Sequence, residues 1–594
     1  MEEIRNFTII AHINHGKSTL ADRFLELTKT IDKKEMLPQY LDTLDLEREK
    51  EITIKMHPVR MAYILNSNPY ILDLIDTPGH VDFSYEVSRS LAAVEGAILL
   101  VDATKGIQAQ TVYNLEQARK QNLVIIPVIN KIDLPHAKIE ETSQELSELL
   151  KVPQEDIIKV SAKEGTNVEQ VLKAIIEKVP QPKIDIESVF QALIFDSKYD
   201  SFKGVIVFTR VFSGKIKPDS KIFLVHSGSE GEVKELGYFK PHLEKAEELK
   251  SGEIGYIATG IKETEKVRVG DTLGKLDQRK IKALSGYQIP TPVVFASLYP
   301  QKPEDFESLK TALLKLQLID PSLTFEPETR EALGRGFRCG FLGNLHIEII
   351  IERLKREFGL ELVISTPSVI FKIIDKKGKE HLIFNPADWP QAFQIQETQE
   401  PWVRLEILTP INFLGQVLKI LEDLGGKYIE KKHLSTERVL LIYEVPLREI
   451  IVGFYDKLKN FTQGFASMNY EILGYRKEDL VKLEILIAKQ KEEAFSKIIS
   501  KSKAYDEGQK MVKKLKKILP AQLFSVSLQA AISGRIIARE TIRAKRKDVI
   551  APLYGGDYTR KRKLLEKQKK GKAKLKEIGK IRVPHKVFLE MFKS

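Results

Sequence analysis

A loop near the amino terminus restricts the fold of this chain more than any other feature. Residues 11–19 read AHINHGKST, an apolar stretch at 7–10 precedes them, and residues 20–25 follow with helical spacing. A strand, a tight loop and a helix start, in this order, expose backbone N–H groups that bind phosphate. The chain is therefore predicted to begin with alternating strands and helices around a mononucleotide site, over residues 1–181.

Individual residues of this loop have distinct predicted roles. Gly16 lets the backbone approach the phosphates, Lys17 supplies a charge to the β- and γ-phosphates, and Ser18 offers its hydroxyl to Mg²⁺. The first glycine of the usual pattern is replaced by Ala11, so the loop taken alone also fits a polar strand–helix turn. The other candidate nucleotide-binding residues of the loop are Asn14, His15 and Thr19.

A second stretch, Asp76 to His80, reads DTPGH and follows the buried-strand pattern of residues 71–75. Asp76, at the end of a strand, can hold Mg²⁺ directly or through water. Gly79 can turn its N–H toward the γ-phosphate, and His80 would then lie where a water attacks. Taken alone, the stretch fits an ordinary Pro-Gly turn equally well.

A third stretch, NKID at residues 130–133, indicates the base. The Asp133 carboxylate can accept hydrogen bonds from the N1–H and N2 amino group of guanine, which adenine cannot offer. Asn130 can tie this stretch to the phosphate-binding loop, and Lys131 can lie over the base, with Ile132 between them. The stretch therefore favours GTP over ATP.

A weaker element, Ser161-Ala162-Lys163, follows the strand-like residues 157–160 and can close the base pocket. Such a tripeptide is usually a chance match. The four stretches occur in the required order, however, and each follows a strand pattern, so together they predict a GTP site.

Composition limits the remaining possibilities. A chain of 594 residues is expected to hold about four domains, and 42% hydrophobic with 30% charged residues is typical of globular proteins. A single cysteine, Cys339, allows no disulfide within the chain and suits the reducing cytoplasm. The amino terminus lacks a signal-peptide pattern, and no apolar run of 18 residues predicts a transmembrane segment.

The positive charge is concentrated at the carboxyl terminus. Residues 541–594 contain 18 Lys and Arg but 5 Asp and Glu, whereas the net charge of the whole chain is +12. The run at 560–572 can neutralise phosphates, the glycines of the YGGD sequence at 554–557 can form a phosphate-binding turn, and Tyr554 and Tyr558 can stack on bases. This favours RNA as a partner, although a solvated flexible tail is the ordinary alternative.

Three strings carry a family resemblance: AHINHGKST, LDTLDLEREKEITIK from residue 41, and DTPGHVDFSYEVSRSL from residue 76. They resemble the translational GTPases, specifically the LepA family, also called elongation factor 4. We refer to residues 41–54 and 76–83 as the first and second switch segments. The resemblance implies that Thr53 helps to hold Mg²⁺ and the γ-phosphate, and that His80 positions the attacking water once a ribosome engages.

Two positions depart from that family. The family usually has Asp where this chain has Asn14, which removes a negative charge beside the phosphates. It usually has Gly where this chain has Glu51, which puts a side chain on a segment that folds over the nucleotide. GTP binding is still expected, while the hydrolysis rate and closure of the switch segments depend on these two residues.

The resemblance extends over the whole chain and implies a multidomain α/β protein. The expected parts are a P-loop GTPase domain (1–181), an antiparallel β-barrel domain II (182–285), an α+β domain III (291–367), an α+β domain like domain V of elongation factor G (368–487), and a basic LepA-type C-terminal domain (488–594). The two α+β domains are expected to be ferredoxin-like. Elongation factor G carries an additional domain, for which residues 367–400 leave no room.

The glycine-rich run at 334–343 resembles a phosphate site in isolation. It lacks the Lys-Ser/Thr ending, and a closely similar string occurs in the third domain of the LepA family, so we interpret it as a strand–turn–helix junction. Cys339, His346 and Glu348 lack a second histidine at ligand spacing and do not predict a metal site.

The function implied by the resemblance is a ribosome-dependent GTPase that uses GTP/GDP and Mg²⁺. Its expected partners are the ribosome and, through the basic terminal domain, transfer RNA, and it is expected to be a monomer. The family is thought to move transfer RNAs backward on mistranslocated ribosomes, to protect translation under stress, and to occur in the cytoplasm and peripherally at the cell membrane. The alternatives are a forward translocase like elongation factor G and a GTP-gated RNA scaffold with little hydrolysis.

Overall fold

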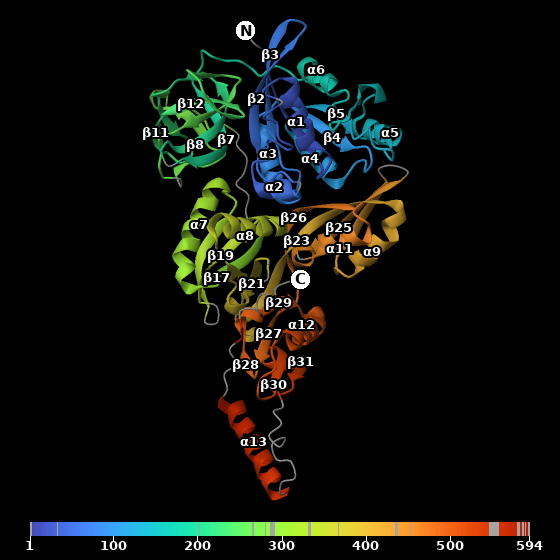
Figure 1. The fold of residues 1–594 in the computed structure, drawn as a ribbon, viewed down its shortest axis with the longest axis vertical. Helices are drawn as coiled ribbons and strands as arrows, with labels where there is room; N and C mark the ends of the chain where they lie inside the picture. Colours follow the sequence, from blue (N-terminus) through green and yellow to red (C-terminus); the bar gives the residue numbers. More distant parts are fainter. Residues whose placement is uncertain are drawn as a thin grey trace.

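The computed structural model describes residues 3–32, 34–50, 52–200, 202–263, 266–278, 281–284, 292–330, 334–365, 367–433, 437–451, 453–545 and 558–578, and a few positions between 583 and 591. Two structural units lie side by side at one end, two lie below them, and a fifth tapers into the last helix (Figure 1). None of the described helices is both long and apolar enough to cross a membrane.

The first unit is a six-stranded sheet in the order β2-β3-β1-β4-β5-β6, in which the β2–β3 pair is antiparallel and the other pairs are parallel. Apolar clusters cover both faces of the sheet. Because β1, β3 and β5 run in the same direction, the loops that follow them lie at one edge. The elements are β1 (Glu3–Ala11), α1 (Lys17–Leu27), α2 (Asp45–Lys50), β2 (His57–Leu65), β3 (Asn68–Asp76), α3 (Ser84–Ala92), β4 (Gly96–Asp102), α4 (Ala109–Lys120), β5 (Val124–Asn130), α5 (Ile139–Leu150), β6 (Ile158–Lys159) and α6 (Val168–Lys178).

The barrel unit is an antiparallel sheet of eight strands in the order β11-β10-β16-β7-β8-β15-β12-β13, with a separate β14–β9 pair. Aromatic and aliphatic residues of β7, β8 and β15 pack against Met56, Ile75 and Val94 of the first unit. The strands are β7 (Gln191–Asp200), β8 (Gly204–Ser213), β9 (Lys215–Ile216), β10 (Lys221–Leu224), β11 (Glu230–Glu232), β12 (Glu235–Lys240), β13 (His242–Lys245), β14 (Leu249–Lys250), β15 (Ile254–Ala258) and β16 (Thr272–Lys275).

The third unit is a four-stranded antiparallel sheet, β18-β19-β17-β20, with two helices. Its glycine-rich run forms β19 and the turn into α8, so no second phosphate loop is built there. Its elements are β17 (Val294–Pro300), α7 (Phe306–Ile319), β18 (Thr324–Arg330), β19 (Gly334–Phe341), α8 (Asn344–Phe358) and β20 (Leu362–Ile364).

The fourth unit is a six-stranded antiparallel sheet in which the 16-residue strand β23 pairs with β21, β25 and β26. The third and fourth units share one apolar core. The elements are β21 (Phe371–Asp375), β22 (Glu380–Ile383), β23 (Ile395–Pro410), α9 (Leu414–Glu422), β24 (Lys427–His433), β25 (Arg438–Pro446), α10 (Leu447–Ile451), α11 (Phe454–Phe461) and β26 (Ser467–Lys477).

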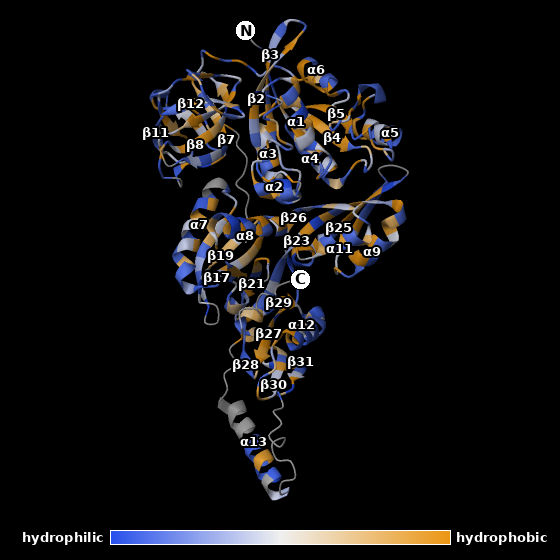
Figure 2. Ribbon diagram, in the orientation of Figure 1, coloured by the Kyte–Doolittle hydropathy of each residue, from blue (hydrophilic) through white to orange (hydrophobic). Residues whose placement is uncertain are grey.

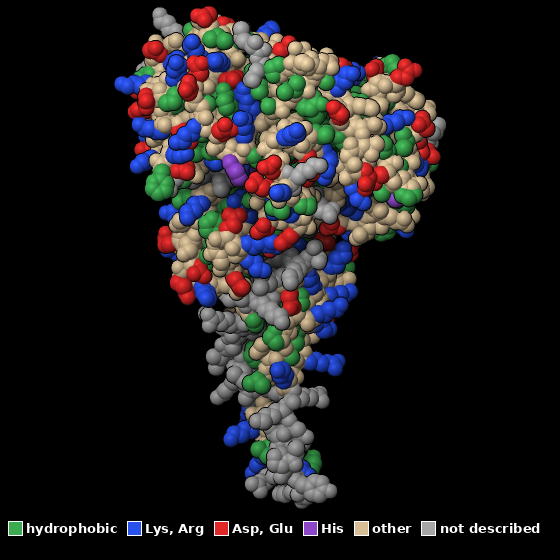
Figure 3. Space-filling model, turned by 45° about the horizontal axis from the view of Figure 1, so that its top comes forward, with side chains coloured by type: hydrophobic (Ala, Val, Ile, Leu, Met, Phe, Trp, Pro, Cys, Tyr) green, Lys and Arg blue, Asp and Glu red, His purple; other side chains and the backbone are tan. Residues whose placement is uncertain are grey.

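The fifth unit is an antiparallel sheet around β27 and β30, covered by α12, and the last described helix, α13, extends from it (Figure 1). Apolar residues gather in the strands at the centre of each unit (Figure 2), whereas Lys and Arg side chains project from the tapered end (Figure 3). The elements are β27 (Leu480–Ile487), β28 (Gln490–Lys491), β29 (Lys497–Ser500), α12 (Ala504–Ile518), β30 (Val526–Ile532), β31 (Arg535–Ile542) and α13 (Tyr558–Ile578).

Candidate nucleotide-binding site and its contacts

The phosphate-binding loop connects the end of β1 to the first turn of α1. Gly16 adopts φ 90°, a left-handed conformation that favours glycine, and an added Cβ would lie 2.3 Å from Nδ2 of Asn130. Glycine is therefore required here for two independent reasons. Ser18 and Thr19 lie in the first turn of α1, whose N-terminal N–H groups favour an anion.

Lys17 is the centre of a buried polar cluster. Its Nζ donates to both carboxylate oxygens of Asp76, at 2.7 and 2.6 Å, and to Oγ1 of Thr53 at 2.7 Å. Lys17 is 8% exposed and Asp76 is fully buried. Burial raises the pKa of Asp76, and the adjacent ammonium of Lys17 opposes that shift.

Oxygen atoms suited to a hard cation surround this cluster. Ser18 Oγ lies 3.4 Å from Thr53 Oγ1, and Thr53 donates to Oδ1 of Asp42 at 2.9 Å. Asp42 Oδ2 is buried and has no hydrogen-bond partner among the described residues. Carboxylate and hydroxyl oxygens are the ligands that Mg²⁺ prefers, so this set of donors fits the ion. The sequence reasoning did not single out Asp42, because only the folding back of the first switch segment brings it to Thr53.

The candidate base-binding residues lie beside the phosphate-binding loop. Asn130 donates from Nδ2 to the His15 carbonyl oxygen at 3.0 Å and accepts from the Ala162 N–H at 2.9 Å. Ser161 Oγ donates to Oδ1 of exposed Asp133 at 2.6 Å. Asn130 and Ser161 thus connect three loops that lie far apart in the sequence. Ile132 is half-buried and Lys163 is exposed.

Lys131 and His15 have contacts that the sequence did not indicate. Lys131 Nζ donates to the Asn14 carbonyl oxygen at 2.6 Å and pairs with Asp102 at 2.7 Å. His15 is fully buried, its Nδ1 accepts the Asp102 N–H at 3.2 Å, and burial lowers the pKa of the ring to about 3. The His15 side chain therefore points into the unit, which leaves its backbone to face a ligand.

His80 lies in the second switch segment, beside the phosphate-binding loop. An added Cβ on the preceding Gly79 would lie 3.0 Å from the Ala11 carbonyl oxygen. His80 Nδ1 accepts the Asp82 N–H at 3.1 Å. Burial lowers the pKa of His80, while the carboxylate of Asp82 opposes the shift. Burial therefore favours the neutral form of the imidazole.

Asp82 connects the second switch segment to the third unit. Its Oδ2 accepts the N–H groups of Leu345 at 2.9 Å and of His346 at 3.4 Å, which are two of the orphan donors in the first turn of α8. An added Cβ on Gly343 would lie 2.2 Å from Cγ of Asp82. Gly343 has an extended backbone that any residue can adopt, so its requirement comes from contact with the other unit.

The same helix contacts the first switch segment. Arg356 of α8 donates to both carboxylate oxygens of Glu49 at 2.6 and 2.8 Å, and Lys50 pairs with Glu348 at 3.0 Å. The apolar residues Leu46, Ile54, Phe83 and Ile349 form one small cluster across the interface. Helix α8 therefore touches both switch segments, a feature that no local sequence pattern indicates.

His346, which the sequence raised as a possible metal ligand, has a structural role. Its Nε2 lies 2.9 Å from Oδ2 of Asp320, and its Nδ1 accepts the Leu342 N–H at 3.1 Å. Both nitrogens therefore face groups of the third unit.

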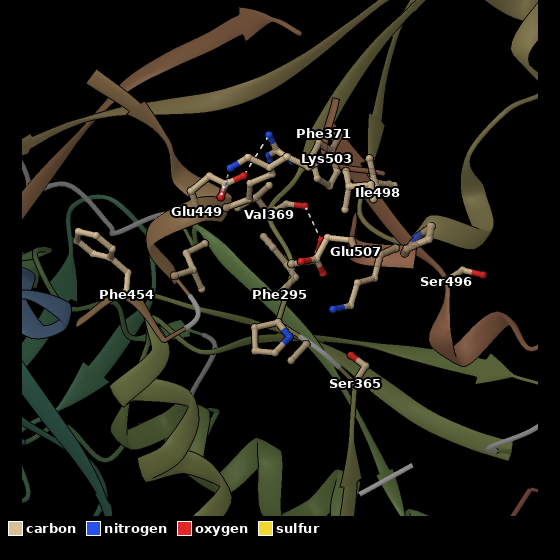
Figure 4. A pocket seen from close by; sticks show the side chains of 18 of the residues that line it. Phe295, Ser365, Val369, Phe371, Glu449, Phe454, Ser496, Ile498, Lys503 and Glu507 are labelled. Carbon is tan, nitrogen blue, oxygen red and sulfur yellow. Dashed lines mark hydrogen bonds and ion pairs between the residues drawn. The ribbon is translucent and has the colours of Figure 1, made fainter. Parts of the chain in front are cut away.

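A large cavity lies away from this site, where the third, fourth and fifth units meet (Figure 4). Its volume is about 1270 Å³. Several of the cations on its wall are paired with carboxylates: Lys503 with Glu449 at 2.8 Å and Arg448 with Glu400 at 2.6 Å. The Lys503–Glu449 pair joins the fifth unit to the fourth, whereas the Arg448–Glu400 pair lies within the fourth unit. The nucleotide-binding residues lie elsewhere.

Comparison with known protein families assigns a relationship to each unit. Residues 2–181 match the elongation factor Tu GTP binding domain and residues 204–274 match elongation factor Tu domain 2. Residues 289–366 match elongation factor G domain III, residues 397–486 the elongation factor G C-terminus, and residues 487–593 the GTP-binding protein LepA C-terminus. The predicted fold class is thereby confirmed.

Curated relatives match along the full chain. Elongation factor 4 of Clostridium botulinum (strain Langeland) is 50% identical over 592 residues, covering 100% of this chain and 98% of the relative. Elongation factor 4 of Thermotoga maritima is 49% identical, covering 99% and 95%, and that of Cytophaga hutchinsonii is 48% identical, covering 100% of both. A solved crystal structure of a Thermus thermophilus protein, ttk003000868, shares the fold with a TM-score of 0.57 and 18% identity, covering 80% of this chain and 97% of that one.

Proposed function

The chain belongs to the elongation factor 4 (LepA) family of translational GTPases, and from this membership we propose how its own residues bind and hydrolyse GTP on the ribosome. The family resemblance predicted from the sequence is confirmed by the full-length relatives. Membership implies GTP/GDP binding and GTP hydrolysis, together with interaction with the ribosome and transfer RNA.

We assign the binding roles as follows. Lys17 and the backbone N–H groups of residues 14–19 hold the phosphates, and Asp133 selects guanine with the help of Asn130, Lys131 and residues 161–163. Ser18, Thr53 and Asp76 would hold Mg²⁺, which neutralises phosphate charge when bound. The support for these roles is that Thr53 and Asp76 both lie within 2.7 Å of Lys17 Nζ, and that Asp42 Oδ2 beside them has no hydrogen-bond partner in the described part of the chain.

We assign His80 the positioning of the attacking water. Burial lowers the pKa of the ring, and because Nδ1 accepts the Asp82 N–H, the neutral ring carries its proton on Nε2. Nε2–H can then donate to a water oxygen. In this tautomer the residue orients the nucleophile and does not remove its proton.

We further propose that helix α8 transmits the state of both switch segments to the rest of the molecule. The observation that carries this proposal is that one helix holds Asp82 at its first turn and Glu49 at its last turn. Rearrangement of either segment on hydrolysis would break contacts with α8 and change how the first and third units dock.

On the ribosome, we propose that this cycle drives backward movement of transfer RNAs, with the basic fifth unit and α13 contacting RNA. The exposed cations of α13 with described side chains include Arg562, Lys563, Lys567, Lys569 and Lys570. The YGGD sequence at 554–557 lies outside the described residues. A role under stress, a monomeric state, cytoplasmic location and peripheral contact with the cell membrane stay predictions.

Ribosome-stimulated phosphate release tests the enzymatic proposal. GTP turnover is measured with and without ribosomes for the native chain, for His80→Ala and for His136→Ala, an exposed histidine of the same unit. We expect His80→Ala to retain GDP binding and lose stimulation, while His136→Ala behaves as the native chain. Stimulation that survives in His80→Ala overturns the role of His80.

Two alternatives are separated by further measurements. The scaffold alternative rests on Asn14 and on Glu51, which lies outside the described residues. It would be supported if stimulation were absent in the native chain and restored by Asn14→Asp with Glu51→Gly. A forward translocase would move transfer RNAs in the opposite direction in a bidirectional translocation assay. Residues 367–396, between the two elongation factor G matches, form β21, β22, short turns and the start of β23, and hold no additional domain.

A further inference from the structure

The ring of His80 contacts the fourth unit. Tyr455, on the first turn of α11, meets the imidazole edge-to-face, with ring centroids 6.1 Å apart and planes at 86°. Phe83 packs on another side at 6.3 Å. The His80 side chain is 12% exposed as a result. A residue more than 370 positions away in the sequence thus helps to fix the orientation of the candidate water-positioning group.

Tyr455 is itself held in place. Lys459, one turn along α11, lies with its ammonium 4.5 Å from the centroid of the Tyr455 ring, within the range of a cation–π contact. The neighbouring Phe454 and Leu458 are buried in the core shared by the third and fourth units. Helix α11 is therefore anchored, and a displacement of the fourth unit would carry Tyr455 with it.

Within the described residues the His80 ring has a hydrogen bond from Asp82 and ring contacts with Phe83 and Tyr455. No hydrogen bond links it to Lys17, Thr53 or Asp76 in that part of the chain, although those residues form the polar cluster assigned to the phosphate and metal. In this arrangement the ring is therefore held by the second switch segment and by α11, and not by the polar cluster.

We propose that Tyr455 is a positioning residue for GTP hydrolysis, which holds the His80 ring against α11 until the fourth unit shifts. The inference rests on the proposed role of His80. It adds that docking of the fourth unit, and not the switch segments alone, sets the rate of hydrolysis without ribosomes. Loss of an edge-to-face aromatic contact changes the ratio of released to held His80 rings by about 2- to 12-fold. The rate of GTP hydrolysis without ribosomes is expected to change by the same factor.

The test measures GTP turnover without ribosomes in the full-length chain at saturating GTP. We expect Tyr455→Ala to raise the turnover rate by about 2- to 12-fold with little change in KM. Tyr455→Phe keeps the ring and is expected to stay near the native rate. Lys459→Met removes the cation beside Tyr455 and leaves the core intact, so a smaller increase is expected. Tyr428→Ala, at an exposed tyrosine of the same unit, is the matched control.

Two further measurements separate the possible failures. His80→Ala combined with Tyr455→Ala should abolish the increase, because the released ring is then missing. Modification of His80 by diethyl pyrocarbonate, followed by peptide mass spectrometry, should be faster in Tyr455→Ala and reports on release without any activity.

An unchanged or lower turnover rate in Tyr455→Ala, or unchanged modification of His80, overturns the inference while leaving the proposed function standing. If His80→Ala alone keeps full ribosome stimulation, the proposed role of His80 fails first. Should Tyr455→Ala not fold, as judged by loss of GDP binding, the Lys459→Met variant decides by the same criteria.

Discussion

The contact between Asp82 and Gly343 allows the coupling between the second switch segment and α8 to be measured. We expect Gly343→Ala to open the first turn of α8, because the new Cβ would lie 2.2–2.3 Å from the carboxylate of Asp82 and must displace it. The displaced carboxylate loses its hydrogen bonds to the N–H groups of Leu345 and His346. Hydrogen bonds to charged groups contribute about 1.5–3 kcal/mol, so we take about 2 kcal/mol for this loss.

Amide hydrogen exchange is the suitable assay, because unfolding of a multidomain chain is not a two-state transition. A local destabilisation of about 2 kcal/mol corresponds to roughly 30-fold faster exchange at Leu345 and His346. Asp82→Ala should give a similar increase, because it removes the same acceptor. Gly359→Ala is not a valid control, since Gly359 has φ 66° and a side chain there would be strained. Gly415→Ala is a suitable control, because Gly415 is helical and an added Cβ would meet no atom within 4 Å.

The double variant provides the decisive comparison. The atoms that the new Cβ meets are Cγ, Oδ1 and Oδ2 of Asp82, all of which are absent in Asp82→Ala. Adding Gly343→Ala to that background should therefore change exchange by less than about twofold, a small effect on the scale of additive mutations. If the two increases multiply to several hundredfold, the residues act independently and the reasoning from this contact is refuted.

Three further predictions concern the nucleotide site. Asn130→Ala leaves the His15 carbonyl and the Ala162 N–H without their buried partner, and each unsatisfied group costs about 1–3 kcal/mol. The affinity for GDP, measured by calorimetry, should therefore fall at least about 30-fold. A change under threefold would contradict this prediction. Asp133→Ala should reduce the preference for GTP over ATP in competition binding by about 1–3 kcal/mol, and an unchanged preference would remove its role in base selection. Burial raises the pKa of Glu47 from 4.5 to about 7, so the folded state binds a proton more tightly than the unfolded state. Protection of residues 44–55 in amide exchange should therefore fall as the pH rises from about 4.5 to 7. Glu47→Gln should flatten that pH dependence, and a native profile in the variant would contradict the prediction.

The first unit could be predicted from the sequence because its chemistry is local. A phosphate site needs a strand, a tight loop and a helix start in succession, and Gly16 and Lys17 mark that arrangement within nine residues. The order of the later motifs then follows from a parallel sheet whose strand ends meet at one edge. For the same reason the local sequence alone predicts roles for Asn130 and Asp133.

The contacts between units could not be predicted, because they depend on how separately folded parts dock. Gly343 stands in a glycine-rich run that indicated only a turn, and its requirement comes from Asp82 in another unit. Tyr455 carries no motif at all, yet it packs on His80. Asp42 differs from other acidic residues of its segment only because the backbone folds it onto Thr53. Local periodicity contains no information on such pairs.

The second switch segment is held by three parts of the molecule at once, which limits how it can move. Thr77 donates to the Ile9 carbonyl oxygen of β1 at 2.8 Å, His80 packs on Tyr455 of α11, and Asp82 accepts from the first turn of α8. The aromatic contact and the neutral hydrogen bond contribute about 0.5–1.5 kcal/mol each, and the hydrogen bonds to the charged Asp82 carboxylate about 1.5–3 kcal/mol, so releasing all three contacts costs more than one hydrogen bond to a nucleotide supplies. A partner that moves the third and fourth units together could release two of them without touching the nucleotide. Because a binding partner shifts such an equilibrium only by its difference in affinity for the two arrangements, the large surface of the ribosome is well suited to this role.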